Sequence, residues 1–295
     1  MRHFSIKELE NFSEVKSHTI RVWEQRYKIL VAQRKETNRR YYTLSQVEAL
    51  LNLSLLTRNG RKISSLIKDN EQEIQLRLKG LETPEAKKDK AINFLIIKMF
   101  SNQIEDFENI LNNWTFSFGI DNTIKSIIIP FLEKVHLLSY SDKRIEIHFV
   151  VTAVRRKIIF GIEKINAEVE QHKTALLFLP RGEHYDLMLL YIAYLLKNLG
   201  VNVLYLGTDI SIENLYDVIQ EKKPDFLYTY VSSGKQLKQL QVFAKRINTS
   251  FPSLRLFAAT NERIAFTFPS DNTVNLFYHG DVCQTLDVKS LLVHT

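Results

Sequence analysis

The sequence predicts a multidomain protein with a helical N-terminal module at residues 1–72, a four-helix bundle at residues 84–170 and an α/β module at residues 173–295 with a doubly wound parallel sheet. Three observations predict this division. The length of 295 residues suggests about two domains. The basic surplus is confined to one end, because residues 1–80 carry 16 Lys and Arg against 9 Asp and Glu, whereas the remainder carries 24 of each. The apolar periodicity also changes near residue 173, from helical spacing to short runs that alternate with helices.

The composition excludes several classes of protein. With 45% hydrophobic and 25% charged residues, 9 Gly and 6 Pro, the chain is neither disordered nor collagen-like. Its one Cys cannot form an internal disulfide, so we expect a reducing, cytoplasmic environment. The N-terminus has no apolar signal core, and no apolar run approaches the roughly 20 residues that span a bilayer, so we expect no membrane contact.

Helix start signals divide the first module. Ser5 and Glu8 form a capping box, and Thr43 and Gln46 repeat it. Between them, Ser17 is expected to be the N-cap of a helix that runs to Tyr27. The segment 33–42 has no helical apolar period and is rich in Lys and Arg, which indicates a loop or hairpin. The charged segment 68–90 is expected to be a connector with some helix in it.

The second module is expected to be helical throughout. Apolar residues recur every three or four positions from Ile124 to Leu138, as on one face of an amphipathic helix that Pro130 interrupts and kinks. Similar stripes predict helices at 92–100, 104–111 and 150–165, which together would form a small bundle.

The third module alternates short apolar runs with amphipathic helices. Strands are expected at 175–179, 201–206, 226–231, 254–259 and 274–278. Helices are expected at 185–199, 211–221, 234–247 and 261–266 and at the C-terminus. This order predicts a doubly wound parallel sheet, in which ligands bind outside the carboxyl ends of the strands.

Two short helices, a basic hairpin and a further capped helix describe a winged helix-turn-helix. His18, Thr19 and Arg21 would lie in the first turn or so of the second helix, which enters the major groove in this class of domain. Ile20, Trp23 and Tyr27 would face the core. The remaining candidates lie on or next to the hairpin and suit contacts to phosphate: Arg26, Arg34, Asn38, Arg39, Arg40 and Tyr41. Tyr41 can instead be a packed aromatic residue of the wing.

From Phe4 to about Ile67 the sequence resembles the MerR family of transcription regulators. The resemblance rests on Ser5-Ile6-Lys7-Glu8-Leu9, on Thr19-Ile20-Arg21-Val22-Trp23-Glu24-Gln25-Arg26-Tyr27, and on Arg34 with Asn38-Arg39-Arg40-Tyr41-Tyr42. It departs from the family pattern at Ala32, where a proline is usual, and at Asn38, where a glycine is common. The resemblance implies that the chain binds a double-stranded operator with two-fold symmetry as a dimer, with a tetramer as the alternative.

Over its full length the architecture resembles the cobalamin-dependent, light-responsive repressors of carotenoid genes within that family. In those proteins the loop after the first strand reads Asp/Glu-x-His-x-x-Gly, and the histidine binds cobalt. Aligned from Glu183, this chain places Tyr185 at the histidine and Met188 at the glycine, while His184 comes one position early. A phenol at neutral pH is a poor ligand for such a metal.

Two further cobalamin signatures are altered. Where the relatives carry paired glycines after the fourth strand, this chain has Ala258 and Ala259. Of a Trp and a Glu-His pair in the bundle, His148 alone remains, while Ser232 after the third strand matches a serine that contacts the nucleotide tail. The residues left for a ligand are Glu183, His184, Tyr185, His148 and Ser232.

The sequence therefore predicts a DNA-binding regulator with a degenerate sensor module that serves oligomerisation, another small ligand or a protein partner. No resident cofactor, metal or catalytic residue is expected. The alternative is a functional cobalamin-dependent repressor that uses His184 or a non-standard mode of binding. No P-loop, nucleophile elbow or zinc-protease motif supports an enzyme. An antirepressor that binds protein instead of DNA would lose the basic bias, which this chain keeps.

Overall fold

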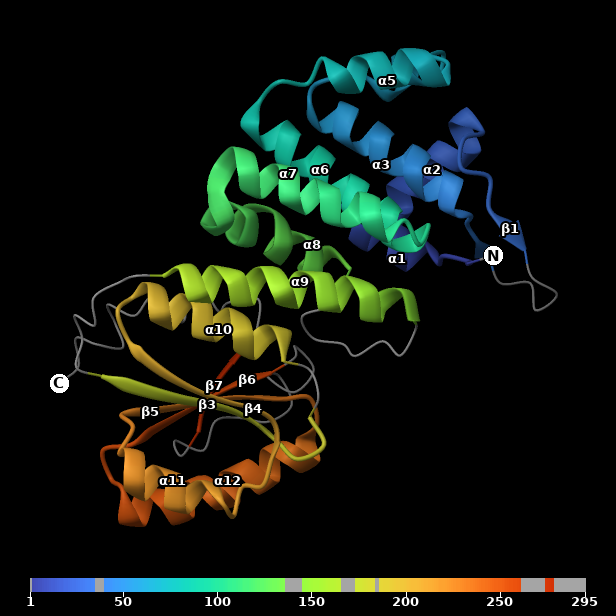
Figure 1. The fold of residues 1–295 in the computed structure, drawn as a ribbon. Helices are drawn as coiled ribbons and strands as arrows, with labels where there is room; N and C mark the ends of the chain where they lie inside the picture. The colour runs from blue at the N-terminus through green and yellow to red at the C-terminus, as the bar shows by residue number, and fades with distance from the viewer. Residues whose placement is uncertain are drawn as a thin grey trace. The chain divides into compact units, whose positions relative to one another are not determined.

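In the computed structural model (Figure 1) the described residues are 2–34, 40–135, 145–165, 173–183, 186–260 and 274–278. The chain divides into two compact units. One comprises Met1–Val135 and Lys143–Ala153, and the other comprises His136–Asp142 and Val154–Thr295. The division into three domains therefore stays a prediction, and the two units are described separately.

The first half of unit 1 contains the helices predicted for the helix-turn-helix and a short antiparallel strand pair. Its elements are α1 (Ile6–Ser13), α2 (Ser17–Tyr27), β1 (Gln33–Arg34), β2 (Arg40–Tyr41), α3 (Leu44–Arg58), α4 (Ile63–Leu66) and α5 (Glu71–Lys79). Both predicted capping boxes are confirmed, at Ser5 before α1 and at Thr43 before α3. Next to these boxes, Phe4 and Tyr42 are fully buried and join each other by backbone hydrogen bonds.

One local prediction was wrong in this part of the chain. Lys16, not Ser17, precedes α2, and Ser17 is the first helical residue. The Ser17 hydroxyl donates to Glu10 at 2.6 Å, so a tertiary acceptor takes the group that was expected to cap the helix. The segment 68–90, expected to be a connector with some helix in it, contains the helix α5, which begins with a capping box between Asn70 and Glu73.

The helices of the predicted bundle are present. They are α6 (Pro84–Phe100), α7 (Ile104–Thr123), the π-helical turn η1 (Ile124–Ile128), α8 (Ile129–Lys134) and α9 (Ile145–Lys164). Pro130 lies in the first turn of α8, directly after the π-helical turn, so the irregular turn comes where the missing N–H of a proline interrupts the helical hydrogen bonds. The chain also breaks at Gly119, whose φ of 80° lies outside helical values. Because α6 contacts α3 as well as α7, η1 and α8, unit 1 includes α1 to α8 together, with the first part of α9 up to Ala153. Their arrangement as a four-helix bundle stays a prediction.

Unit 2 contains the predicted parallel sheet, with strands in the order β4-β3-β5-β6-β7. The strands are β3 (Thr174–Pro180), β4 (Asn202–Ile210), β5 (Phe226–Val231), β6 (Arg255–Thr260) and β7 (Asn275–Tyr278), and every neighbouring pair is parallel. The helices are α10 (Leu187–Asn198), α11 (Leu215–Lys222) and α12 (Gly234–Ser250). The expected helix at 261–266 and the C-terminal helix lie outside the described residues.

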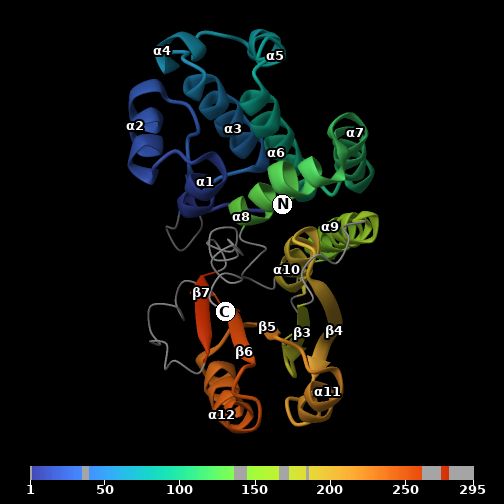
Figure 2. The same ribbon diagram turned by 90° about the vertical axis from the view of Figure 1, so that its left-hand side faces the viewer.

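The sheet is covered on both faces. Figures 1 and 2 show α10 on one face and α11 with α12 on the other, which confirms the doubly wound arrangement. On the second face Leu176, Leu227 and Leu256 pack against Leu240 of α12. The strand order reverses between β3 and β5, and a ligand site is therefore expected outside the carboxyl ends of these two strands.

Candidate functional site

Helices α1 and α2 meet at a tight turn in which Glu14 has the left-handed φ of 61°. In α2, His18 and Arg21 are exposed and Thr19 is half-buried. Ile20 and Trp23 are buried, with exposed fractions of 0% and 8%. The apolar side of α2 is thus buried at these two positions, as predicted, whereas Tyr27 is half-buried. The first turn of α2 presents polar side chains to solvent.

No side chain caps the N-terminus of α2. The backbone N–H groups of Ser17, His18 and Thr19 are the first three of the helix, and the N-terminus carries a positive partial charge. An uncapped helix N-terminus beside exposed polar side chains is suited to binding a phosphate group. The hydrogen bond from Ser17 and the nearby positive charges of Lys7 and Lys16 lower the pKa of the Glu10 carboxyl, so Glu10 stays ionised next to this turn.

The short strand pair presents the other candidate cations. Arg34 at the end of β1 and Arg40 at the start of β2 are exposed, and their backbones pair with each other. Arg26 is exposed in the last turn of α2. Tyr41 is half-buried and stacks on His3, with ring centroids 3.8 Å apart, which supports its packing role. Asn38 and Arg39 lie outside the described residues.

Glu24 joins α2 to the strand pair, and sequence reasoning missed it. Its carboxylate accepts hydrogen bonds of 3.1 Å from the Ala32 N–H and from the Tyr42 hydroxyl, and lies 3.6 Å from Arg40 Nη1. Burial, reinforced by the charge of Glu24, raises the pKa of Tyr42 to about 12. The signal in the sequence was an isolated acid in a helix that otherwise carries cations.

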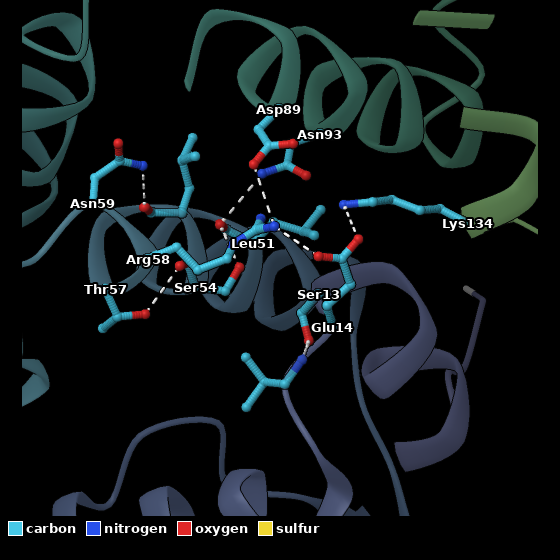
Figure 3. A network of polar contacts seen from close by, with 12 residues as sticks. Ser13, Glu14, Leu51, Ser54, Thr57, Arg58, Asn59, Asp89, Asn93 and Lys134 are labelled. Atoms are coloured by element: carbon cyan, nitrogen blue, oxygen red, sulfur yellow. Dashed lines mark hydrogen bonds and ion pairs between the residues drawn. The ribbon is translucent and has the colours of Figure 1, made fainter. Parts of the chain in front are cut away.

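A second polar network extends from the same turn into the rest of unit 1. Figure 3 shows the Glu14 carboxylate between Arg58 of α3, at 2.7 Å, and Lys134 of α8, at 3.0 Å. Arg58 also lies 3.2 Å from Asp89 of α6. The turn between α1 and α2 is therefore linked electrostatically to three other helices.

In unit 2, Glu183 connects the loops that follow β3 and β5. Its side chain is 4% exposed, and its Oε1 accepts a hydrogen bond of 2.5 Å from the Ser232 N–H. The structure thus brings together two of the predicted ligand residues at the point where the strand order reverses. His184 and Tyr185 lie outside the described residues, and His148 is exposed on α9.

A further ion pair next to this edge was not predicted. Arg155 of α9 makes hydrogen bonds of 2.7 to 3.2 Å to both carboxylate oxygens of Asp186, the residue before α10. The pair fixes the start of α10 against the second half of α9.

Within the described ranges, no group of three or more His, Cys, Asp and Glu residues is placed to hold a metal ion. The helices described there include none that is long and apolar enough to cross a membrane.

Comparisons with known proteins found similar proteins for the N-terminal part and for most of the chain. Residues 4–68 match the family described as MerR HTH family regulatory protein, so the N-terminal part of the chain is a MerR-type helix-turn-helix domain. The chain is 22% identical over 259 residues to the HTH-type transcriptional repressor CarH of Myxococcus xanthus, a match that covers 85% of this chain and 86% of that protein.

Among solved structures, the monomethylamine corrinoid protein of Methanosarcina barkeri has a similar fold. The match has a TM-score of 0.52 at 11% identity and covers 70% of this chain and 99% of that chain. The predicted resemblance to MerR regulators with a sensor module of cobalamin-binding type is therefore confirmed. The matched family and the curated relative are regulators of transcription, in agreement with the prediction that the chain is not an enzyme.

Proposed function

We propose that this chain is a sequence-specific DNA-binding regulator of transcription whose C-terminal module has the fold of a cobalamin-binding protein without the usual cobalt ligand. The single observation that supports DNA binding most strongly is the MerR-type helix α2. It buries Ile20 and Trp23 and exposes His18 and Arg21 beside an uncapped N-terminus.

In this proposal the residues of the first unit have different tasks. His18, Thr19 and Arg21 meet base edges in the major groove, because the first turn of a recognition helix is the part that reaches them. Arg26, Arg34 and Arg40 contact phosphates, which position the protein without reading sequence. Asn38 and Arg39 complete the wing, and Tyr41 supports it by packing on His3.

For the C-terminal module, the described residues do not fit an ordinary cobalamin site. Met188, at the place of a glycine in the relatives, is fully buried in α10. Ala258 and Ala259 are fully buried in β6, and the Thr260 hydroxyl donates to the Val231 carbonyl at 2.9 Å. These side chains occupy the positions where the relatives carry small residues that admit a ligand.

The second candidate function is a repressor that does bind cobalamin, through His184 or in a different mode. It is favoured by the similarity to CarH over 85% of the chain and by the fold shared with a corrinoid protein. Either function places two copies of the chain on a two-fold operator, so a dimer is part of the proposal.

One set of experiments tests both parts. The full chain should shift a duplex that contains its own upstream region, and Arg21→Ala should weaken this binding while Lys222→Ala, which removes an exposed charge from unit 2, leaves it unchanged. Equal binding by all three proteins would overturn the DNA-reading assignment. Purification with adenosylcobalamin should yield a colourless protein. A stoichiometric red complex that His184→Ala abolishes would overturn the proposed loss of cobalamin binding and establish the second candidate.

A further inference from the structure

Unit 2 contains a cavity of about 780 Å³ at the carboxyl edge of the sheet, on the side of α11 and α12. Its walls come from the residues that follow β3, β4 and β5 and from one face of α12. The residues that matter here are Arg181, Ser211, Glu213, Tyr216, Lys235 and Arg246. A cavity of this size is typical of small-molecule sites, and its position beside the reversal in strand order is where doubly wound sheets bind ligands.

The charged side chains of α12 are all positive. The helix contains Lys235, Lys238, Lys245 and Arg246 and no Asp or Glu, although residues 81–295 are neutral as a whole. Its apolar side, with Leu237 and Leu240, is fully buried in the core. The cations therefore lie on the outer face, and all but Lys245 line the cavity.

A further cation reaches the cavity from the opposite wall. Arg181, which follows β3, and Arg246 of α12 both act on Glu213 in the loop after β4. The Ser211 hydroxyl donates to the Glu213 carboxylate, and this hydrogen bond, together with the backbone and the two guanidinium charges, lowers the pKa of that carboxyl. The lining thus has four cations and one carboxylate. Of the two arginines, Arg181 comes from the loop after β3 and Arg246 comes from α12.

An apolar surface adjoins these charges. The Tyr216 ring packs on Phe251 with centroids 5.4 Å apart, and the Arg246 guanidinium lies 5.9 Å from the centre of the Tyr216 ring. Val242, also in the lining, is 71% exposed. The cavity therefore suits a ligand that combines negative charge with a flat or apolar body.

We propose that this cavity binds a nucleoside phosphate, with its phosphate groups between Arg181, Arg246 and Lys235 and its base against Tyr216. Charge-assisted hydrogen bonds from arginine recognise phosphate, and any base can stack on an aromatic ring. The proposal goes beyond the DNA reading of unit 1 and does not depend on it. Binding here would give the C-terminal module a ligand other than cobalamin.

The test uses the full chain without DNA. Calorimetric titration with AMP, GMP, CMP and UMP should show saturable binding of at least one nucleotide. The corresponding nucleoside and inorganic phosphate should each bind at least about tenfold more weakly, because each offers only half of the contacts. The double variant Arg181→Gln/Arg246→Gln should weaken nucleotide binding by about tenfold or more. Lys245→Gln is the matched control, because it removes the same charge from the same helix outside the cavity, and it should leave the affinity within about twofold.

Several results would overturn the proposal. These are no saturable binding of any of the four nucleotides at millimolar concentration, equal affinity of the double variant, or inorganic phosphate that binds as tightly as the nucleotide. A duplex oligonucleotide that displaces the nucleotide from the wild type, and that itself binds more weakly to the double variant, would instead identify a nucleic-acid surface. Circular dichroism of each variant checks that the fold is kept, and Tyr216→Phe should bind better than Tyr216→Leu because it retains the ring.

Discussion

The hydroxyl of Tyr42 donates a 3.1 Å hydrogen bond to the carboxylate of Glu24. Glu24 lies in the middle of α2, and Tyr42 follows the second strand of the pair, so one carboxylate connects α2 to the strand pair. The same carboxylate also accepts from the Ala32 N–H and pairs with Arg40. A single acidic side chain that is 10% exposed therefore links the strand pair to α2.

Glu24→Ala should destabilise the reading domain by about 1–3 kcal/mol, because the Tyr42 hydroxyl and the Ala32 N–H would lose their acceptor in a part-buried place. Urea denaturation followed by circular dichroism measures this change, and DNA affinity should fall with it. Glu48→Ala, which removes an exposed acid from α3, is the control and should change stability by less than about 0.5 kcal/mol. Equal stability of the two variants would contradict the role given to Glu24.

The stability of the protein should depend on Tyr42 at alkaline pH. The pKa of Tyr42 is about 12 in the fold against an ordinary 10.0, with burial as the main cause and Glu24 as the next. A raised pKa means that the neutral phenol is favoured in the folded state, so its contribution is complete below pH 10 and is lost as the pH rises towards 12. The difference in unfolding free energy between the wild type and Tyr42→Phe should shrink across this window. A difference that stays constant from pH 9 to pH 12 would contradict the prediction.

Arg39→Ala and Arg40→Ala should each weaken binding to all duplex sequences alike. Each lost phosphate contact lowers the slope of log K against log salt by about 0.9. Fluorescence anisotropy with specific and unrelated duplexes at several salt concentrations measures both quantities. Arg40 is the more informative position, because its side chain is 48% exposed although it lies 3.6 Å from Glu24. Unchanged affinity and slope in both variants would eliminate the wing assignment.

Glu183→Ala should loosen the carboxyl edge of the sheet in unit 2. The Ser232 N–H would lose an acceptor at 2.5 Å, and we expect a loss of about 1–2 kcal/mol in unfolding free energy. Hydrogen exchange should show faster exchange of the Ser232 amide, whereas Glu183→Gln, which keeps an acceptor oxygen, should restore most of the protection. Glu221→Ala serves as a surface control, since that carboxylate is 70% exposed. Protection that is equal in all variants would show that Glu183 does not hold this loop.

The sequence predicted interactions between residues close together in the chain better than interactions between distant ones. Capping boxes at Ser5 and Thr43 involve groups three residues apart, and both were predicted and found. The same local signal between Asn70 and Glu73 starts α5, within the segment expected to be a connector with some helix in it. At Ser17 the local rule was wrong, because its hydroxyl found a stronger acceptor seven positions earlier, in Glu10.

The candidate sites follow the same rule. The exposed first turn of α2 could be predicted from the spacing of Ile20 and Trp23, since a helix fixes which residues share a face. The contact between Glu24 and Tyr42 spans 18 positions, and the one between Glu183 and Ser232 spans 49. Nothing in the local pattern of either residue indicates its partner.

The sequence by itself determined the basic reading module, the helical segments and the five parallel strands, because charge, capping and apolar period act within a few residues along the chain. Tertiary structure alone decided which side chains converge. The link from the turn at Glu14 to Arg58 and Lys134, and the cavity between Arg181 and Arg246, join residues that the fold brings together from separate elements. Such contacts depend on how helices and strands pack, and packing is set by the whole core, not by any one segment of it.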